Sequence, residues 1–97
     1  MTVTTDAVET TDANLLSVQT LARLVPGTAT QVAITARQHE FTIDEPDALG
    51  GTDLGANPVE HLLAALGSCQ VITYQVWAQK LGLTIDRVDV QLDGDID

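Results

Sequence analysis

Cys69 is the only cysteine in the 97-residue chain, and its side chain is the best suited of any here to nucleophilic or redox chemistry. A thiol reacts as its thiolate, so a reactive Cys69 needs a nearby cation or hydrogen-bond donors that favour ionisation. Only four residues are basic, and among them we predict Arg37 as that cation, with Arg23 as the reserve candidate. Free cysteine is also among the most buried residue types, so the alternative interpretation is that Cys69 only packs.

Two histidines, His39 and His61, are the other side chains that can bind a metal together with Cys69. Their spacing matches none of the common zinc patterns, and only one thiol is available to join them. The acidic residues between positions 44 and 53 do not match an EF-hand loop either. No phosphate-binding pattern follows the glycines of that segment. We therefore predict neither a metal site nor a cofactor.

The cysteine lies within a segment that has unusually complete helix signals. Asn57 is a typical N-cap residue, Pro58 falls at the first helical position, and Glu60 falls where a capping box requires an acid. Gly82 provides the expected C-terminal stop. The sequence therefore predicts one long helix over about 58–81.

The predicted helix is apolar on nearly all sides, which is typical of a buried helix. Leu62 and Leu66 share the face of Cys69, and Trp77 follows two turns later, so these three apolar side chains are predicted to form a wall beside the thiol. A chain of 97 residues can hardly cover both faces of such a helix. We therefore expect a homodimer.

Alternation of apolar and polar residues predicts β-strands before and after the helix. It runs over 31–36 and 40–44, and the residues between these two segments form a tight reversal, so we predict a β-hairpin. A further strand is predicted over about 84–93. Residues 14–25 partly fit a short amphipathic helix that ends at a Pro-Gly pair. Together these elements predict an α+β fold.

The composition excludes several classes of function. Four basic residues against fourteen acidic ones give a net charge of −10, which repels nucleic-acid phosphates and anionic membrane surfaces. We expect an acidic, disordered N-terminus over 1–13, because it shows no hydrophobic period. No signal peptide is recognisable, and the helix is too polar to be a membrane span. A single cysteine cannot form an internal disulfide, so we expect a cytoplasmic protein.

The segment GANPVEHLLAALGSC, residues 55–69, resembles the OsmC/Ohr family of osmotically inducible and organic hydroperoxide resistance proteins. Members of this family share the pattern G-x-N-P-x-E-x-L-L-A-A-L-G-x-C. Residues 44–46, 49–53 and 80–83 also look like its OsmC-like branch, and the resemblance covers about residues 30–97. It implies an OsmC-like domain over 14–97, with an N-terminal hairpin, a buried central helix and a following strand. It also implies intertwined homodimers with sites at the subunit interface.

The same resemblance implies an activity, the thiol-dependent reduction of organic hydroperoxides in oxidative stress defence. Cys69 would attack the peroxide and become a sulfenic acid, and an external thiol or dithiol would reduce it. Arg37 would stabilise the thiolate and position the peroxide. Leu62, Leu66 and Trp77 would favour organic substrates.

The sequence departs from the family pattern at two points. Val59 stands where the peroxidase branch has a glutamate directly after Asn-Pro, and Glu60 is better explained as a helix cap. No second, resolving cysteine follows Cys69, so we infer a chain that is incomplete at its C-terminus or naturally short. These departures favour an alternative: a non-enzymatic protein of the same fold, either a small-ligand binder or a structural dimer, with Cys69 a buried packing residue.

Overall fold

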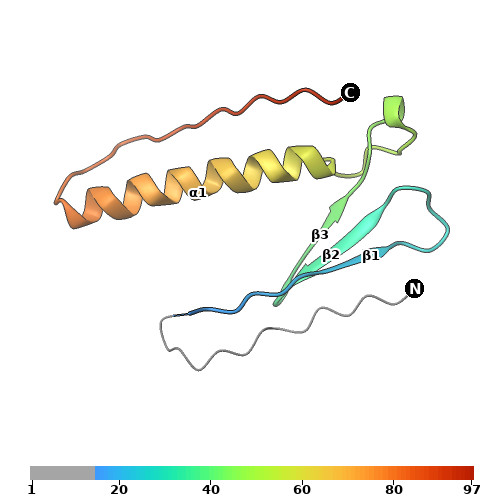
Figure 1. Cartoon of the computed structure of the whole chain (residues 1–97), viewed down its shortest axis with the longest axis horizontal. Coiled ribbons are helices and arrows are strands. Elements are labelled where there is room, and N and C mark those ends of the chain that lie inside the picture. Colours follow the sequence, from blue (N-terminus) through green and yellow to red (C-terminus); the bar gives the residue numbers. More distant parts are fainter. Residues whose placement is uncertain (1–14) are drawn as a thin grey trace. The chain divides into compact units, whose positions relative to one another are not determined.

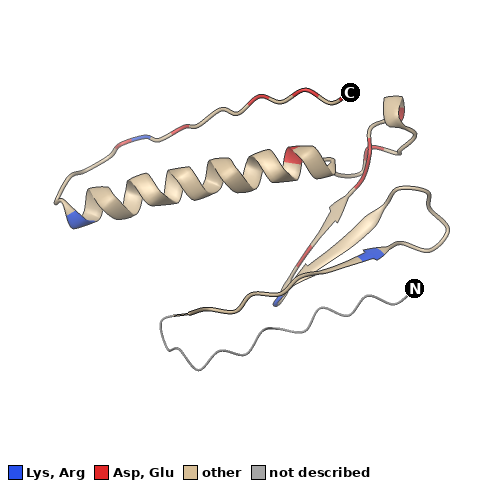
Figure 2. Cartoon of the chain, in the orientation of Figure 1, with Lys and Arg blue, Asp and Glu red and all other residues tan. Residues whose placement is uncertain are grey.

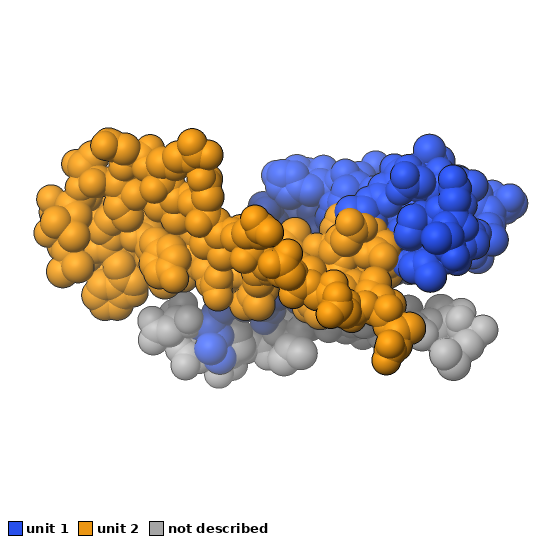
Figure 3. Space-filling view, turned by 90° about the horizontal axis from the view of Figure 1, so that it is seen from above, with its two compact units in different colours: residues 1–56 blue, residues 57–97 orange. Residues whose placement is uncertain are grey.

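A computed structural model describes residues 15–97 and has the predicted α+β composition (Figure 1). Its elements in chain order are β1 (Leu21–Leu24), β2 (Val32–Ala36), β3 (His39–Ile43), a single 3-10 turn (Asp47–Leu49) and α1 (Pro58–Lys80). The chain divides into two compact units, residues 1–56 and 57–97, which Figure 3 colours separately. The predicted disorder of 1–13 lies outside the described residues.

The first unit contains a three-stranded antiparallel sheet in the order β1-β2-β3. The predicted hairpin is confirmed: β2 and β3 pair from Ala36 opposite His39 to Val32 opposite Ile43, and two residues connect them. Because side chains alternate across a strand, Leu24, Val32 and Ile43 lie side by side on one face. Arg23, Ala33 and Thr42 lie on the opposite face, so one sheet face is apolar and the other is mixed.

The prediction of a short helix over 14–25 is wrong. Residues 21–24 form strand β1, and residues 15–20 have no regular secondary structure. Backbone groups of β1 pair with β2, from Leu21 opposite Thr35 to Leu24 opposite Val32, and this ladder outweighs a weak helical pattern. The Pro-Gly pair turns the chain between the two strands, where the Val25 N–H donates to the Gln31 carbonyl at 2.9 Å.

The predicted helix over 58–81 is confirmed, with α1 ending at Lys80. The Glu60 N–H donates to Asn57 Oδ1, and the Asn57 N–H donates to Glu60 Oε1, both at 2.9 Å. At the other end Gly82 adopts φ +70° and the Leu83 N–H donates to the Ala78 carbonyl at 2.8 Å, which is a Schellman motif. The signals read from the sequence are therefore the interactions that start and stop this helix.

Replacing the cap should measurably weaken the helix. We expect Asn57→Ala to lower the free energy of unfolding by about 1 kcal/mol, because the Glu60 N–H loses its acceptor. Glu60→Gln is the matched control, since a carboxamide oxygen still accepts from the Asn57 N–H. Urea denaturation followed by circular dichroism measures both variants. Equal losses would show that the cap bond contributes nothing beyond the charge of Glu60.

The strand expected over about 84–93 does not form. Residues 83–97 run back beside α1 as an extended segment that contains no assigned strand (Figure 1). Its alternation is nevertheless real: Ile85, Val88, Val90 and Leu92 are half-buried between exposed neighbours. An extended segment becomes a β-strand only through a hydrogen-bonding neighbour, and none of the described residues pairs with it.

The extended segment covers one face of α1. A Cβ atom placed on Gly67 would lie 2.7 Å from Leu92 Cδ1, and one placed on Gly94 would lie 3.3 Å from Leu63 Cδ1. Glycine at these two positions therefore lets the segment approach the helix closely. The small size of Gly67 serves contact with this segment of its own chain.

The rest of α1 is not buried within the described residues. Only Gly67 and Ala78 are buried along its length, so the predicted buried helix is not formed by the described residues alone. Figure 2 shows that charged residues occur only near the two ends of the helix, at Glu60 and Lys80. Burial by a second chain stays a prediction. No helix of residues 15–97 has the length and apolarity needed to cross a bilayer.

Candidate functional site

Cys69 lies at the middle of α1 with its side chain exposed. It is about three turns from the helix N-terminus, so the helix dipole adds little to the stability of a thiolate. The Thr73 hydroxyl donates to the Cys69 carbonyl at 2.8 Å, which ties the helix backbone here and leaves the sulfur accessible. Cys69 is therefore not buried within the described residues. The alternative interpretation, in which Cys69 only packs, requires a burial that these residues do not provide.

The thiol sits in an exposed apolar stripe of α1, which we define as Leu62, Leu66, Cys69, Val76 and Trp77. The structure places the three predicted wall residues on this stripe, and Leu62, Leu66 and Trp77 are 69%, 50% and 56% exposed. Contiguous exposed apolar surface of this kind marks a binding or interaction site. The stripe is turned away from the face that residues 83–94 cover, so α1 has one closed and one open face.

Lys80 lies at the C-terminal end of the stripe. Its Nζ atom lies 5.0 Å from the centroid of the Trp77 ring, which is within range of a cation–π interaction. Part of the Trp77 ring is therefore engaged by a cation. The ring edge and the leucines remain available to an apolar ligand.

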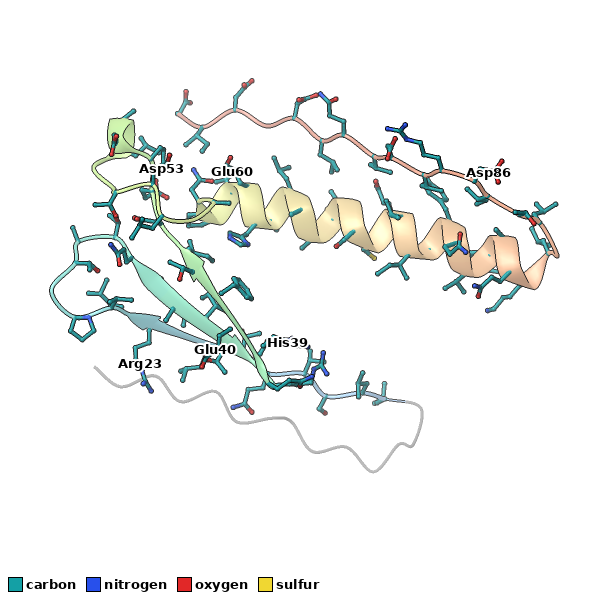
Figure 4. All side chains as sticks on the ribbon, turned by 180° about the vertical axis from the view of Figure 1, so that it is seen from behind. Arg23, His39, Glu40, Asp53, Glu60 and Asp86 are labelled. Atoms are coloured by element: carbon teal, nitrogen blue, oxygen red, sulfur yellow. The ribbon has the colours of Figure 1, made fainter. Side chains whose placement is uncertain are left out.

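Arg37 occupies the two-residue turn between β2 and β3, with an exposed side chain. Its φ of +55° lies in the left-handed region, which costs a residue with a side chain about 1 kcal/mol or more. Strain of this kind persists where the structure or the function requires a particular residue. Arg23 lies on β1, on the mixed face of the sheet (Figure 4). Both arginines belong to the first unit and Cys69 to the second.

The best-formed polar cluster in the described residues is one that the sequence analysis missed. Asp44, at the end of β3, is fully buried. Its Oδ1 accepts from the Thr30 hydroxyl and from the Glu45 N–H at 2.7 Å. Its Oδ2 accepts from the Thr52 hydroxyl at 2.5 Å and from the Leu54 N–H at 3.2 Å. We call Asp44 and these four donor residues the Asp44 cluster.

These hydrogen bonds explain the electrostatics of the cluster. The Thr30 hydroxyl, followed by the Thr52 hydroxyl and the two backbone N–H groups, holds the pKa of Asp44 far below its ordinary value, against the opposing effect of burial. The carboxylate is therefore ionised and fully engaged as an acceptor. It can neither act as a general acid nor bind a cation without losing these donors.

The loop from 44 to 56 is folded tightly around this carboxylate. The Asp53 N–H donates to the Glu45 carbonyl at 3.0 Å, and the Asp44 N–H donates to the Ala56 carbonyl at 3.4 Å. Asp53, labelled in Figure 4, adopts φ +56° where the loop reverses. The glycines and the threonine that follow Asp44 were the available sequence signal for this loop. They did not indicate that residues separated along the chain converge on Asp44.

The Asp44 cluster predicts a specific pH dependence. A carboxyl group whose pKa is lowered on folding stabilises the protein fully above its ordinary pKa of 3.8, and this stabilisation is lost as the pH falls below that value. The difference in unfolding free energy between wild type and Asp44→Asn should be constant from about pH 5 to 8 and should shrink below 3.8. Urea titrations at several pH values measure it. A difference that grows on acidification would contradict the assignment.

The two histidines considered in the sequence belong to different units. His39 lies on β3 in the first unit (Figure 4), and His61 lies in the first turn of α1, half-buried. Within residues 15–97 the structure contains no group of three or more histidine, cysteine, aspartate or glutamate residues that could hold a metal ion.

Comparison with known protein families gives a match to one family model over part of the chain. Residues 50–97 match the family model described as OsmC-like protein. The matched part contains residues 50–56 of the loop from 44 to 56, the capping box, all of α1 with Cys69, and the extended segment that covers the helix. A search of the curated proteins and one of the solved structures each gave no significant match.

Proposed function

Residues 50–97 belong to the OsmC-like family, and on this premise we propose that the protein reduces organic hydroperoxides with Cys69 as the peroxidatic nucleophile. The observation that carries the proposal is the exposed thiol at the centre of the apolar stripe on α1, inside the matched segment. A thiol in this setting is reachable by a substrate whose organic part is apolar and whose peroxide group is polar.

The proposed reaction uses one cysteine. The Cys69 thiolate attacks the terminal oxygen of the hydroperoxide, the O–O bond breaks, and the departing alkoxide takes a proton to leave as an alcohol. Cys69 is then a sulfenic acid. An external thiol condenses with it, releasing water and forming a mixed disulfide, and a second external thiol releases reduced Cys69 together with the external disulfide.

The other proposed roles follow from the residues around the thiol. Leu62, Leu66 and Trp77 would contact the organic part of the substrate. Arg37, from the same chain or from a second one, would stabilise the thiolate and hold the peroxide oxygens. Glu60 is assigned to the helix cap instead of to that arginine, because its Oε1 accepts from the Asn57 N–H in the capping box.

We also propose that the protein is a homodimer. The stripe exposes large apolar side chains along the length of α1, and a second copy would remove them from water while leaving Cys69 at the interface. Sedimentation velocity tests this directly. A monomer at micromolar concentration would contradict it.

The first experiment is intact mass spectrometry after one equivalent of cumene hydroperoxide, with dimedone present to trap a sulfenic acid. Rapid, stoichiometric addition of dimedone to Cys69 is the expected result. An unchanged mass over minutes would overturn the peroxidase proposal. The non-enzymatic ligand binder or structural dimer would then replace it, as Val59 and the single cysteine of the sequence favour.

A further inference from the structure

The Asp44 cluster joins three separate segments of the chain. Thr30 comes from the connection between β1 and β2, Asp44 from the end of β3, and Thr52 and Leu54 from the loop that precedes α1. One buried carboxylate thus receives hydrogen bonds from residues up to 14 positions before it and 10 positions after it. The proposed reaction uses none of these residues.

The cluster restrains the residues that lead directly into α1. Leu54 donates to the carboxylate, a Cβ on Gly55 would lie 2.2 Å from the Thr42 carbonyl oxygen, and the Ala56 carbonyl accepts from the Asp44 N–H. The next residue is Asn57, the N-cap of the helix that carries Cys69. The three residues before the N-cap are therefore held against the end of β3.

A carboxylate suits this task better than any neutral side chain. Its two oxygens accept from four donors at once, whereas a carboxamide replaces one acceptor oxygen with an NH2 group, which leaves donors of these part-buried hydrogen bonds unpaired. A donor that faces an NH2 group loses its acceptor and must find water instead, so the loop would open to water when the carboxylate is replaced.

We propose that Asp44 is a positioning residue, which latches the loop from 44 to 56 and so fixes the backbone of residues 54–56, immediately before the N-cap of α1, the helix that carries Cys69. The catalytic part of this inference rests on the proposed function. The latch would anchor the start of α1 while Cys69, on the same helix, reacts with a hydroperoxide. The intrinsic chemistry of the exposed thiol does not depend on it.

The experiment compares Asp44→Asn and the milder Thr52→Val with two matched controls in the full chain. Thr52→Ser keeps the hydroxyl that donates to Asp44, and Asp47→Asn removes an exposed acid from the same loop. Amide hydrogen exchange at Asp53 and Leu54 reports the latch without any chemistry. The rates of Cys69 with iodoacetamide and with cumene hydroperoxide then report positioning.

We expect exchange at Asp53 and Leu54 to rise at least about tenfold in Asp44→Asn and Thr52→Val, with the amides of β2 and α1 unchanged. The hydroperoxide rate should fall by about tenfold while the iodoacetamide rate stays the same. Both controls should behave as wild type.

Several outcomes would overturn the proposal. Unchanged hydrogen exchange at both amides would show that Asp44 does not latch the loop. Faster exchange throughout the sheet and helix would indicate general destabilisation, and faster loop exchange with an unchanged hydroperoxide rate would remove the positioning role. If wild type itself consumes no hydroperoxide, the proposed function fails, and the exchange data still decide whether the latch exists.

Discussion

Cys69→Ser should reduce hydroperoxide consumption to the rate of the buffer and abolish dimedone labelling. A serine hydroxyl does not ionise near neutral pH and forms no sulfenic acid, so both the nucleophile and the product of the first step disappear. The side chain is exposed on α1, so exchanging sulfur for oxygen removes no buried contact. Activity should therefore be lost without a change in the urea midpoint. Peroxide consumption in the presence of excess dithiothreitol measures the effect.

A displaced thiol provides the sharper control. The double variant Cys69→Ser with Ser68→Cys keeps one exposed cysteine on the same turn of α1 but rotates it by about 100° around the helix axis. The new thiol would leave the stripe and approach the groove that Ser68 lines together with residues 90–94. We expect no recovery of activity. Full recovery would show that any exposed thiol on this helix suffices, which would contradict a built site around Cys69.

The elements that the sequence predicted correctly are those encoded by neighbouring residues. Asn57, Pro58 and Glu60 lie within four positions, and they make the interactions that their spacing indicates. The hairpin of β2 and β3 needs only a two-residue reversal between alternating segments. Local signals of this kind do not depend on the rest of the fold, which is why they can be read from sequence alone.

The elements that the sequence did not predict depend on distant partners. Residues 21–24 are a strand because β2 offers a ladder, whereas 84–93 has the alternation of a strand and no neighbour to pair with among the described residues. Asp44 looked like one acid among several in its loop. Its importance comes from Thr30 and Thr52, which are 14 and 8 residues away and converge only in the folded chain.

The role of Cys69 falls between these two cases. Its place on α1 and the apolar side chains that share its stripe were predictable, because a helix converts spacing into faces. The predicted activating cation, Arg37, stays a prediction, because it belongs to a different unit and spacing along the chain does not determine its distance from Cys69. The match of residues 50–97 to the OsmC-like family model supports the chemistry proposed for Cys69, which composition and periodicity leave open.

Gly51→Ala should be the most destabilising single-methyl change in the loop, lowering the free energy of unfolding by about 3 kcal/mol or more. A Cβ atom at this position would lie 1.9 Å from the Glu45 carbonyl oxygen and 2.4 Å from its carbon. These are backbone atoms, which cannot rotate away as a side chain can. Relief requires the loop to open, which would break the bond from the Asp53 N–H to the same carbonyl.

The neighbouring Gly50 separates this steric effect from the ordinary preference of a turn for glycine. Gly50 adopts φ +87°, and a Cβ there would meet no heavy atom within 4 Å. Gly50→Ala should therefore cost only about 1 kcal/mol, the penalty of a left-handed conformation alone. Urea denaturation of the two variants followed by circular dichroism tests the contrast. Equal losses would mean that the loop relaxes freely around Glu45, and the tight packing on which the Asp44 latch depends would be wrong.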